Sequence, residues 1–246
     1  MSNQVRALCQ SCEEHLNLQT CSLSKSYYYD SLPLCVIDAV FSIGVRYTST
    51  QNVVKNYCNY FGLREYNLCR DENGDQHSIT SFIANIEKLG IQASADRVFC
   101  NHQRTSSRNG ILKAEAVLRF AKVLQKYGFE KLRDLQMTTV PKTAEDEIKA
   151  IPGQKSGLAL HYFYMLAGDD QWAKPDRHVL RFIQISTGQL TTVEKAQELL
   201  FKATLELKSR YPKLTVRLLD YAIWDYMSHG QPLANELSTE KHPHRS

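Results

Sequence analysis

Residues 145–166 read EDEIKAIPGQKSGLALHYFYML, the most informative part of the chain. Thr143 and the acidic residues that follow it predict a short helix that ends near Ala150. After the Pro-Gly pair, an apolar run reaches Leu166 and predicts a second helix. Proline and glycine interrupt helices and mark tight turns. The sequence therefore predicts a hairpin of two helices joined by a short turn.

Helical apolar spacing continues on both sides of this hairpin. Residues 31–43 open with a serine and an early proline, and they are apolar nearly all round, so we expect a central, buried helix there. Ser78 or Thr80 can cap another helix, which Gly90 would end as a left-handed residue. Further helical stripes are expected within residues 114–128, 193–203 and 218–227. No sustained alternation of apolar and polar residues indicates a strand, so the fold class is all-α.

Composition and charge describe an ordinary globular protein of 246 residues. A hydrophobic content of 43% and a charged content of 23% exclude a disordered, collagen-like or fibrous chain. The net charge of +4 permits a nucleic-acid partner without demanding one. No stretch approaches the roughly 20 apolar residues that cross a bilayer. Acidic residues stand where a signal peptide needs an apolar core, so we expect a cytoplasmic protein without a membrane partner.

The seven cysteines all lie at or before Cys100. In a reducing compartment we expect them to be thiols. Cys9, Cys12, His15 and Cys21 are of the residue types that bind zinc, but their spacing is not that of a familiar zinc knuckle. Because this segment also has the pattern of an ordinary helix and its end, we expect buried or idle thiols and assign no metal.

The turn of the predicted hairpin has the features of a phosphate-binding site. Backbone N–H groups at the start of a helix have no partners inside that helix, and they bind phosphate oxygens well. Lys155 adds a cation to the turn and Ser156 adds a hydroxyl. After the second helix, a loop presents the carboxylate of Asp176. An aspartate just before a helix is often only its N-cap, a role that is compatible with chemistry.

Four segments of the chain, in the same order, resemble the helix-hairpin-helix DNA glycosylases, the superfamily of endonuclease III and of the adenine and alkylpurine glycosylases. Residues 151–153 resemble the family's Leu-Pro-Gly-x-Gly hairpin, and residues 175–179 resemble its Val-Asp-x-His-Val element, whose aspartate is catalytic. Residues 42–57 are similar to the end of the family's buried helix and the loop that pushes a side chain into DNA. Residues 109–115 are similar to its lysine-alanine-glutamate helix start. The similarity covers roughly residues 31–185.

The resemblance implies a two-lobed helical fold with a cleft for DNA and the flipped base between the lobes. Residues 31–170 would form the central lobe, with the hairpin near 145–166. Residues 1–30 and 171–246 would form a second lobe built by both termini. The resemblance also implies a monovalent cation among the hairpin carbonyls and no other cofactor. The family's iron–sulfur cluster needs four C-terminal cysteines, which this chain lacks.

Two departures from the family pattern bear on chemistry. Gly157 stands where bifunctional members have the lysine that forms a Schiff base with the sugar, so the resemblance implies a monofunctional enzyme. Lys155 stands where the family has the second glycine of the hairpin. Because glycine permits a positive φ there and lysine resists it, this substitution predicts a different turn geometry.

The resemblance assigns roles to further residues. Asp176 would be the catalytic carboxylate and His178 would support its loop. Arg46 or Tyr47 would fill the gap that the flipped nucleotide leaves; alternatively, both are ordinary surface residues. The other expected DNA contacts are Gly153, Lys155, Ser156, Gly157, Lys174 and Arg177. Tyr28, Tyr162 and Trp172 would line the base pocket, with packing in the core as the alternative.

These expectations favour a monofunctional DNA glycosylase that acts on double-stranded DNA as a nucleoid-associated monomer. It would excise a damaged base, or a modified base of foreign phage DNA, and leave an abasic site. Two alternatives stay open: a non-catalytic DNA-binding protein that keeps the hairpin, and a helical protein-interaction domain.

Overall fold

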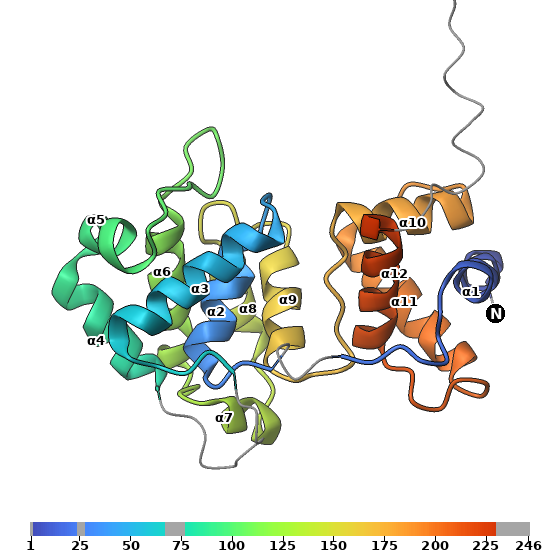
Figure 1. Ribbon diagram of the computed structural model, residues 1–246, viewed down its shortest axis with the longest axis horizontal. Coiled ribbons are helices and arrows are strands. Elements are labelled where there is room, and N and C mark those ends of the chain that lie inside the picture. Colours follow the sequence, from blue (N-terminus) through green and yellow to red (C-terminus); the bar gives the residue numbers. More distant parts are fainter. Residues whose placement is uncertain (1, 24–27, 67–76, 230–246) are drawn as a thin grey trace, which may run out of the picture. The chain divides into compact units, whose positions relative to one another are not determined.

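The computed structural model describes residues 2–23, 28–66 and 77–229 (Figure 1). These residues form helices and connecting segments, and no strand, which confirms the all-α class. Two isolated bridges, Tyr29–Tyr66 and Arg104–Leu112, are the extended pairings found among them. None of the helices in this described part is long and apolar enough to cross a membrane.

The chain divides into two compact units. Leu23–Asp169 form one, here called the central unit, and Met1–Ser22 with Asp170–Ser246 form the other, here called the terminal unit. The helices of the central unit are α2 (Leu32–Phe41), α3 (Tyr47–Phe61), α4 (Ile79–Leu89), α5 (Ile91–Ala93), the π-helical turn Ser94–Val98, α6 (Lys113–Lys126), α7 (Leu132–Met137), α8 (Lys142–Lys149) and α9 (Leu158–Leu166). Those of the terminal unit are α1 (Asn3–His15), α10 (Arg177–Thr187), α11 (Val193–Leu207) and α12 (Val216–His229).

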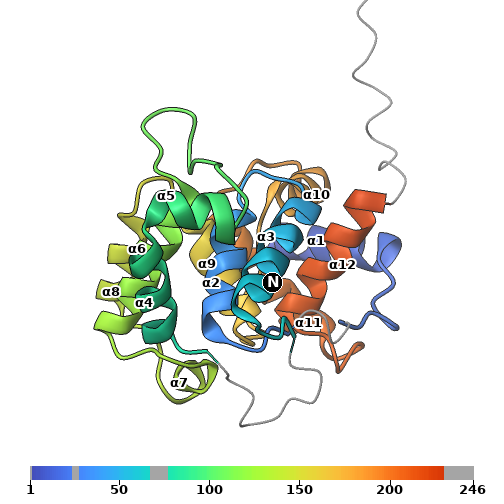
Figure 2. The same cartoon turned by 60° about the vertical axis from the view of Figure 1, so that its left-hand side comes forward.

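Helix α2 is the core of the central unit, as its apolar sequence predicted. All ten of its residues are buried, and α3, α6 and α9 pack around it (Figure 2). Each fully buried Leu, Ile or Phe there contributes about 1.5–3 kcal/mol of transfer free energy. The ring of Phe41 at its end contacts Phe99, at 5.1 Å between centroids. A rigid apolar centre therefore supports the hairpin formed by α8 and α9.

A buried lysine terminates α2. The Nζ of Lys113 donates hydrogen bonds to the carbonyls of Phe41 at 2.9 Å and Ile43 at 2.8 Å, and to Oε1 of Gln103 at 3.3 Å. A cation is favourable at a helix C-terminus, where the last carbonyls have no partners within the helix. Lys113 thus joins the start of α6 to the turn between α2 and α3.

The terminal unit has a hydrophobic core of its own, to which α1, α10, α11 and α12 contribute. Cys9 and Cys12 lie on the buried face of α1, and the Cys9 thiol donates to the carbonyl of Ala203. Burial raises the pKa of Cys9 to about 11 and raises the pKa of Cys12 as well. Both side chains are buried in the hydrophobic core of this unit. No group of His, Cys, Asp and Glu within the described ranges is arranged to hold a metal ion.

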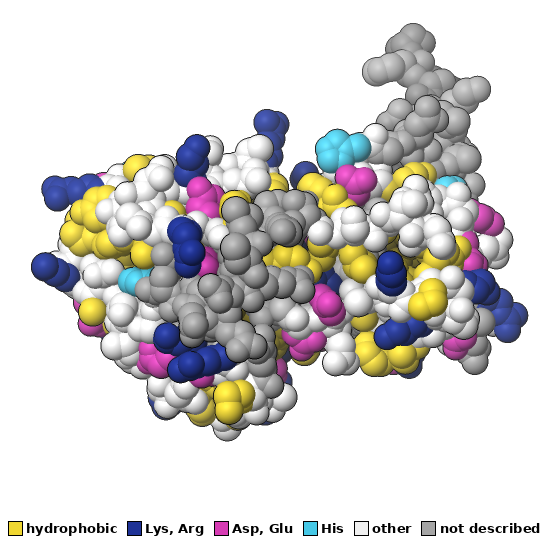
Figure 3. Space-filling view, turned by 60° about the horizontal axis from the view of Figure 1, so that its bottom comes forward, with side chains coloured by type: hydrophobic (Ala, Val, Ile, Leu, Met, Phe, Trp, Pro, Cys, Tyr) yellow, Lys and Arg dark blue, Asp and Glu magenta, His cyan; other side chains and the backbone are white. Residues whose placement is uncertain are grey.

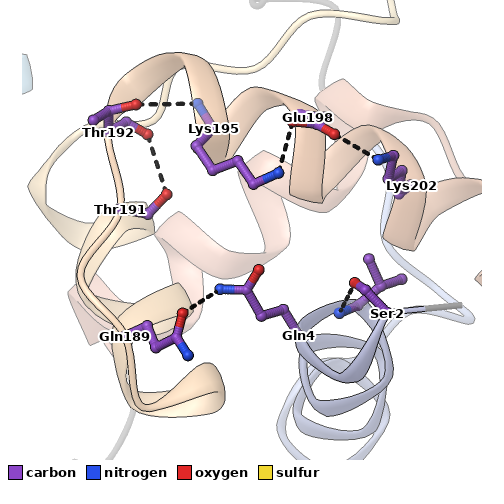
Figure 4. Close-up of polar contacts among 9 residues, drawn as sticks. Ser2, Gln4, Gln189, Thr191, Thr192, Lys195, Glu198 and Lys202 are labelled. Carbon is purple, nitrogen blue, oxygen red and sulfur yellow. Dashed lines mark hydrogen bonds and ion pairs between the residues drawn. The ribbon is translucent and has the colours of Figure 1, made fainter.

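Polar contacts tie the start of α1 to the segment before α11 (Figure 4). The Gln4 side-chain amide donates to Oε1 of Gln189 at 2.8 Å. On α11, Glu198 lies between Lys195 and Lys202, whose ammonium groups lower its pKa to about 2. These surface contacts fix local geometry and contribute little to stability.

Segment 28–30 belongs to the central unit, whereas the sequence analysis had placed it in the second lobe. The Asp30 N–H donates to the carbonyl of Glu65 at 3.2 Å, and the Tyr29 ring stacks on Tyr66. The Asp30 carboxylate also pairs with Arg64 at 3.2 Å. Pairing with residues distant in sequence draws this segment into the central unit.

Of three expected helix ends, one is confirmed and two differ in detail. Ser78, not Thr80, caps α4, because its hydroxyl accepts the N–H of Ser81. Gly90 has the expected positive φ, 81°, but its ψ of 157° is not that of a left-handed helical residue. Helix α8 begins at Lys142 after Pro141, which places Thr143 inside the helix. Proline pre-sets the backbone at this start, so no side-chain cap is required.

Candidate nucleic-acid interface and carboxylate site

Helices α8 and α9 are joined by a turn in which two glycines have positive φ, 86° at Gly153 and 72° at Gly157. The Gln154 N–H donates to the carbonyl of Ile151, and the Gly157 N–H donates to that of Gln154. Lys155 does not have a positive φ. Lysine is therefore accommodated at position 155, because Gly153 and Gly157 are the residues of this turn that take positive φ.

The outer part of this turn presents groups that suit a phosphate. Lys155 and Ser156 are exposed, whereas Gln154, the residue before them in the turn, is buried. Among the described residues, the N–H groups of Lys155, Ser156 and Ala159 meet no hydrogen-bond acceptor. The Ser156 hydroxyl accepts the Leu158 N–H at 3.4 Å. Free N–H donors next to an exposed cation form an anion-binding arrangement.

Gly153 has a second reason to be glycine. A Cβ atom at this position would lie 2.4 Å from Cβ of Thr105 and 2.9 Å from its carbonyl oxygen. The turn therefore rests directly on the segment before α6, which the Thr105 N–H and the Ile111 carbonyl hold as a small loop. Gly153 acts through this close packing as well as through its backbone conformation.

Gly157 is the N-cap residue of α9. A Cβ there would lie 3.0 Å from Cε of Lys149 and 4.0 Å from Nε2 of His161. A lysine at this position would need both a strained φ and a displaced Lys149 side chain. The local packing thus agrees with the absence of an amine at residue 157.

Asp176 is the N-cap of α10 in the terminal unit. Its Oδ1 accepts the N–H of His178 at 2.9 Å and that of Val179 at 3.3 Å. Its Oδ2 accepts no hydrogen bond from any residue the structure describes, and the side chain is half-buried. One oxygen is therefore held rigidly by the helix start while the other remains available to a ligand.

The loop before Asp176 is anchored to α11 and α12. Gln197 accepts the Ala173 N–H at 2.9 Å and donates to the carbonyl of Gln171 at 2.8 Å. The Lys174 N–H donates to Oδ1 of Asp220 at 3.0 Å. Sequence analysis did not identify Gln197 or Asp220, since both lie far along the chain from the loop they hold. The placement of Asp220 in an otherwise apolar stripe of α12 was the available signal.

Cations accompany the carboxylate on α10. Arg177 and Arg181 are exposed and one helical turn apart, on one face, and Lys174 is half-buried. The Nε of Arg177 donates to Nε2 of His178 at 3.3 Å, so His178 contacts its neighbour in the helix through its ring as well as Asp176 through its N–H. In Figure 3, basic and acidic side chains are interspersed over the face drawn, in keeping with the small net charge.

The expected insertion loop is shorter than predicted. Arg46 is the exposed N-cap residue of α3, and Tyr47 is already the first helical residue and is half-buried. Gly44 has a φ of 71° in the turn that precedes them. Because Lys113 binds the carbonyl of Ile43, the backbone of this turn is held in place. Of the two candidates, Arg46 is the one exposed in the turn.

The expected base-pocket aromatics have different environments. Tyr162 is buried and its hydroxyl donates to Oδ2 of Asp38 at 3.4 Å, whereas Tyr28 and Trp172 are half-buried. Asp38 also accepts the Tyr29 hydroxyl at 2.8 Å. Sequence analysis missed Asp38, although it is the one charged residue of α2. A carboxyl group within an apolar helix was the signal.

The described residues thus define an all-helical protein with a helical hairpin suited to phosphate and a carboxylate at a helix start. A family model described as a domain of unknown function (DUF8548) matches residues 6–228, and the chain belongs to this family. No curated protein and no solved structure matches the chain.

Proposed function

We propose that this protein is a monofunctional DNA glycosylase with the two-lobed helix-hairpin-helix fold. It binds double-stranded DNA, flips a damaged or modified base out of the stack, and cleaves its N-glycosidic bond to leave an abasic site. The substrate is either a repair lesion or a modified base of phage DNA. What supports the proposal is the sequence resemblance together with local geometry inside each unit.

The observation that carries the proposal is the hydrogen bonding of the Asp176 carboxylate, in which Oδ1 is held by the start of α10 and Oδ2 is not. Loss of the base builds positive charge on the deoxyribose, and a nearby carboxylate stabilises that charge or accepts a proton from the attacking water. The water oxygen forms the new bond to C1′ as the C1′–N bond breaks. The Oδ1 contacts of Asp176 fix its orientation, and Oδ2 has no competing hydrogen bond among the described residues.

The hairpin between α8 and α9 would bind the DNA backbone. The N–H groups of Lys155 and Ser156 and the Lys155 ammonium would contact phosphate, and such contacts hold register without reading sequence. Lys174 and Arg177 would add phosphate contacts near Asp176. Arg46 in the turn before α3 would enter the gap left by the flipped nucleotide.

As the family resemblance implies, carbonyl oxygens of the hairpin would hold a monovalent cation. The carbonyls of Ile151 and Gln154 each accept one backbone N–H and keep a second lone pair. These are the oxygens that would hold the ion, whose charge would strengthen phosphate binding.

Base release from a panel of duplexes tests the proposal. Each duplex carries one damaged base or one phage-type modified base, and alkali then cleaves the abasic sites. Asp176→Asn should abolish release and leave DNA affinity and folding unchanged, because asparagine is also a good N-cap. Asp225→Asn on the exposed face of α12 is the matched control. Release that persists in Asp176→Asn removes Asp176 from the chemistry.

Borohydride reduction tests the monofunctional assignment separately. A bifunctional enzyme forms a Schiff base that borohydride traps as a covalent protein–DNA adduct. No adduct is expected here, since Gly157 carries no amine. A robust adduct contradicts the assignment even if base release is observed.

One observation favours a second candidate, a non-catalytic helix-hairpin-helix DNA-binding protein. The two hydrogen bonds to Oδ1 make Asp176 a complete helix cap without any chemistry. This candidate predicts DNA binding through the hairpin and no base release from any duplex of the panel.

A further inference from the structure

Asp220 contacts the segment that carries Asp176. Its side chain is buried, with 5% of the residue exposed, and its Oδ1 accepts the Lys174 N–H at 3.0 Å. Lys174 lies two residues before Asp176, and the Asp176 N–H in turn donates to the Lys174 carbonyl at 2.6 Å. The backbone of Lys174 is thus held at its N–H by Asp220 and at its carbonyl by the Asp176 N–H.

Neighbouring contacts show that this part of the loop is built to be rigid. Arg217, one turn before Asp220 on α12, is 1% exposed and its N–H donates to the carbonyl of Asp170 at 3.2 Å. Between Asp170 and Lys174, the side chain of Gln197 on α11 makes two hydrogen bonds to the loop backbone, at Gln171 and Ala173. A loop anchored at both ends and in its middle keeps a functional side chain within the small tolerance that catalysis needs.

We propose that Asp220 is a positioning residue for Asp176: its carboxyl group fixes the loop through the Lys174 N–H, and its own charge state changes the electrostatic field at Asp176. This inference rests on the proposed function of Asp176. The groups that face the Asp220 carboxyl are Asp176 and Lys174 from the loop and Arg217 from its own helix.

The electrostatics of the pair follow from burial and from the two negative charges. Burial raises the pKa of Asp220 well above that of a free aspartate, and the Asp176 carboxylate raises it further. The Lys174 N–H and the Lys174 and Arg217 cations oppose this shift. Asp220 therefore takes up a proton more readily than an exposed aspartate, and while protonated it adds no negative charge beside Asp176.

Carboxyl NMR tests this coupling without any activity. In Asp176→Asn the pKa of Asp220 should fall, because a neighbouring negative charge is gone. Asp225→Asn, at an exposed position of the same helix, should leave it unchanged. An Asp220 titration that is identical in Asp176→Asn and the unmodified protein overturns the electrostatic half of the proposal.

Amide exchange and single-turnover kinetics test the positioning half. In Asp220→Leu the Lys174 amide should exchange faster, and base release should slow on the order of 100-fold at unchanged DNA affinity. Asp220→Asn keeps an acceptor for Lys174 and should restore slow exchange and most of the rate.

The unmodified protein should show a rise in rate as Asp220 ionises, since a second carboxylate stabilises the cationic sugar, and Asp220→Asn should lack this rise.

These outcomes separate the two proposals. If the unmodified protein releases no base from any duplex, the proposed function fails while the exchange and NMR results still decide the contact with Asp220. If base is released and both Asp220 variants match the unmodified protein in rate and pH profile, only the inference about Asp220 fails.

Discussion

The Tyr29 hydroxyl donates a hydrogen bond of 2.8 Å to Oδ2 of Asp38 inside the central unit. Asp38 is fully buried and Tyr29 nearly so. Burial and the adjacent carboxylate raise the pKa of Tyr29, so the phenol stays protonated and remains a donor. The pair is a polar contact in the middle of an otherwise apolar core, and such contacts are costly to leave half-made.

Removal of the Tyr29 hydroxyl should therefore destabilise the protein. Tyr29→Phe leaves the buried carboxyl of Asp38 with one donor fewer, and we expect a loss of about 1–3 kcal/mol in the free energy of unfolding. Tyr60→Phe at an exposed position of α3 is the control and should change stability by less than about 0.5 kcal/mol. Urea unfolding measures both, and equal effects would show that the contact is energetically neutral.

Tyr57 should respond in the opposite way. Its hydroxyl is buried and meets no hydrogen-bond partner among the described residues. Tyr57→Phe removes an unsatisfied polar group, so it should leave stability unchanged or raise it by about 1 kcal/mol. A clear decrease at neutral pH would reveal a partner for this hydroxyl.

The same residue sets a dependence on alkaline pH. Burial raises the pKa of Tyr57 above its ordinary value, so the unfolded chain ionises first as the pH increases. Its contribution is fully present below about pH 10 and is lost as the pH rises toward the folded-state value. Urea unfolding at about pH 8 and about pH 11 should show a smaller decrease for Tyr57→Phe than for the unmodified protein. If the free energy of unfolding falls equally in both proteins, Tyr57 is not the source of this pH dependence.

Alanine substitutions at Gly153 and at Gly188 test the close packing of the hairpin turn, with Gly188, at the end of α10, as the control. Both have positive φ, but a Cβ at Gly188 would meet open space, whereas one at Gly153 would meet Thr105 at 2.4 Å. Gly188→Ala should lose about 1–2 kcal/mol from backbone strain alone. Gly153→Ala should lose about 1–3 kcal/mol more and weaken DNA binding. Thr105→Gly in the Gly153→Ala background should recover part of the loss, and no recovery would argue against this close approach.

The phosphate role of Lys155 predicts a specific salt dependence. Lys155→Glu should weaken binding to all duplexes alike and reduce the slope of log affinity against log salt by about 1. Lys208→Glu makes the same charge change at an exposed position after α11 and should have a smaller effect. Fluorescence anisotropy over a salt series measures both, and equal slopes for the two variants would exclude the hairpin as the phosphate site.

Much of the local structure is readable in the sequence. The apolar run of residues 31–43 produced the buried helix α2, and the Pro-Gly pair produced the turn between α8 and α9. Asp176 could be recognised as a helix cap because an aspartate just before a helix start has few other local roles. The buried helix, the turn and the helix cap could be predicted because each depends on residues within a short segment, which is the range over which apolar spacing and helix propensity act.

Other features were decided by the tertiary structure alone. Asp38 accepts hydrogen bonds from the hydroxyls of Tyr29 and Tyr162. Asp220 accepts one from the Lys174 N–H, 46 positions away in the chain. The normal backbone at Lys155 was likewise not predictable from the family pattern, because Gly153 and Gly157 take the left-handed conformations. A buried polar group must find its partner wherever packing brings one, and no local pattern encodes that choice.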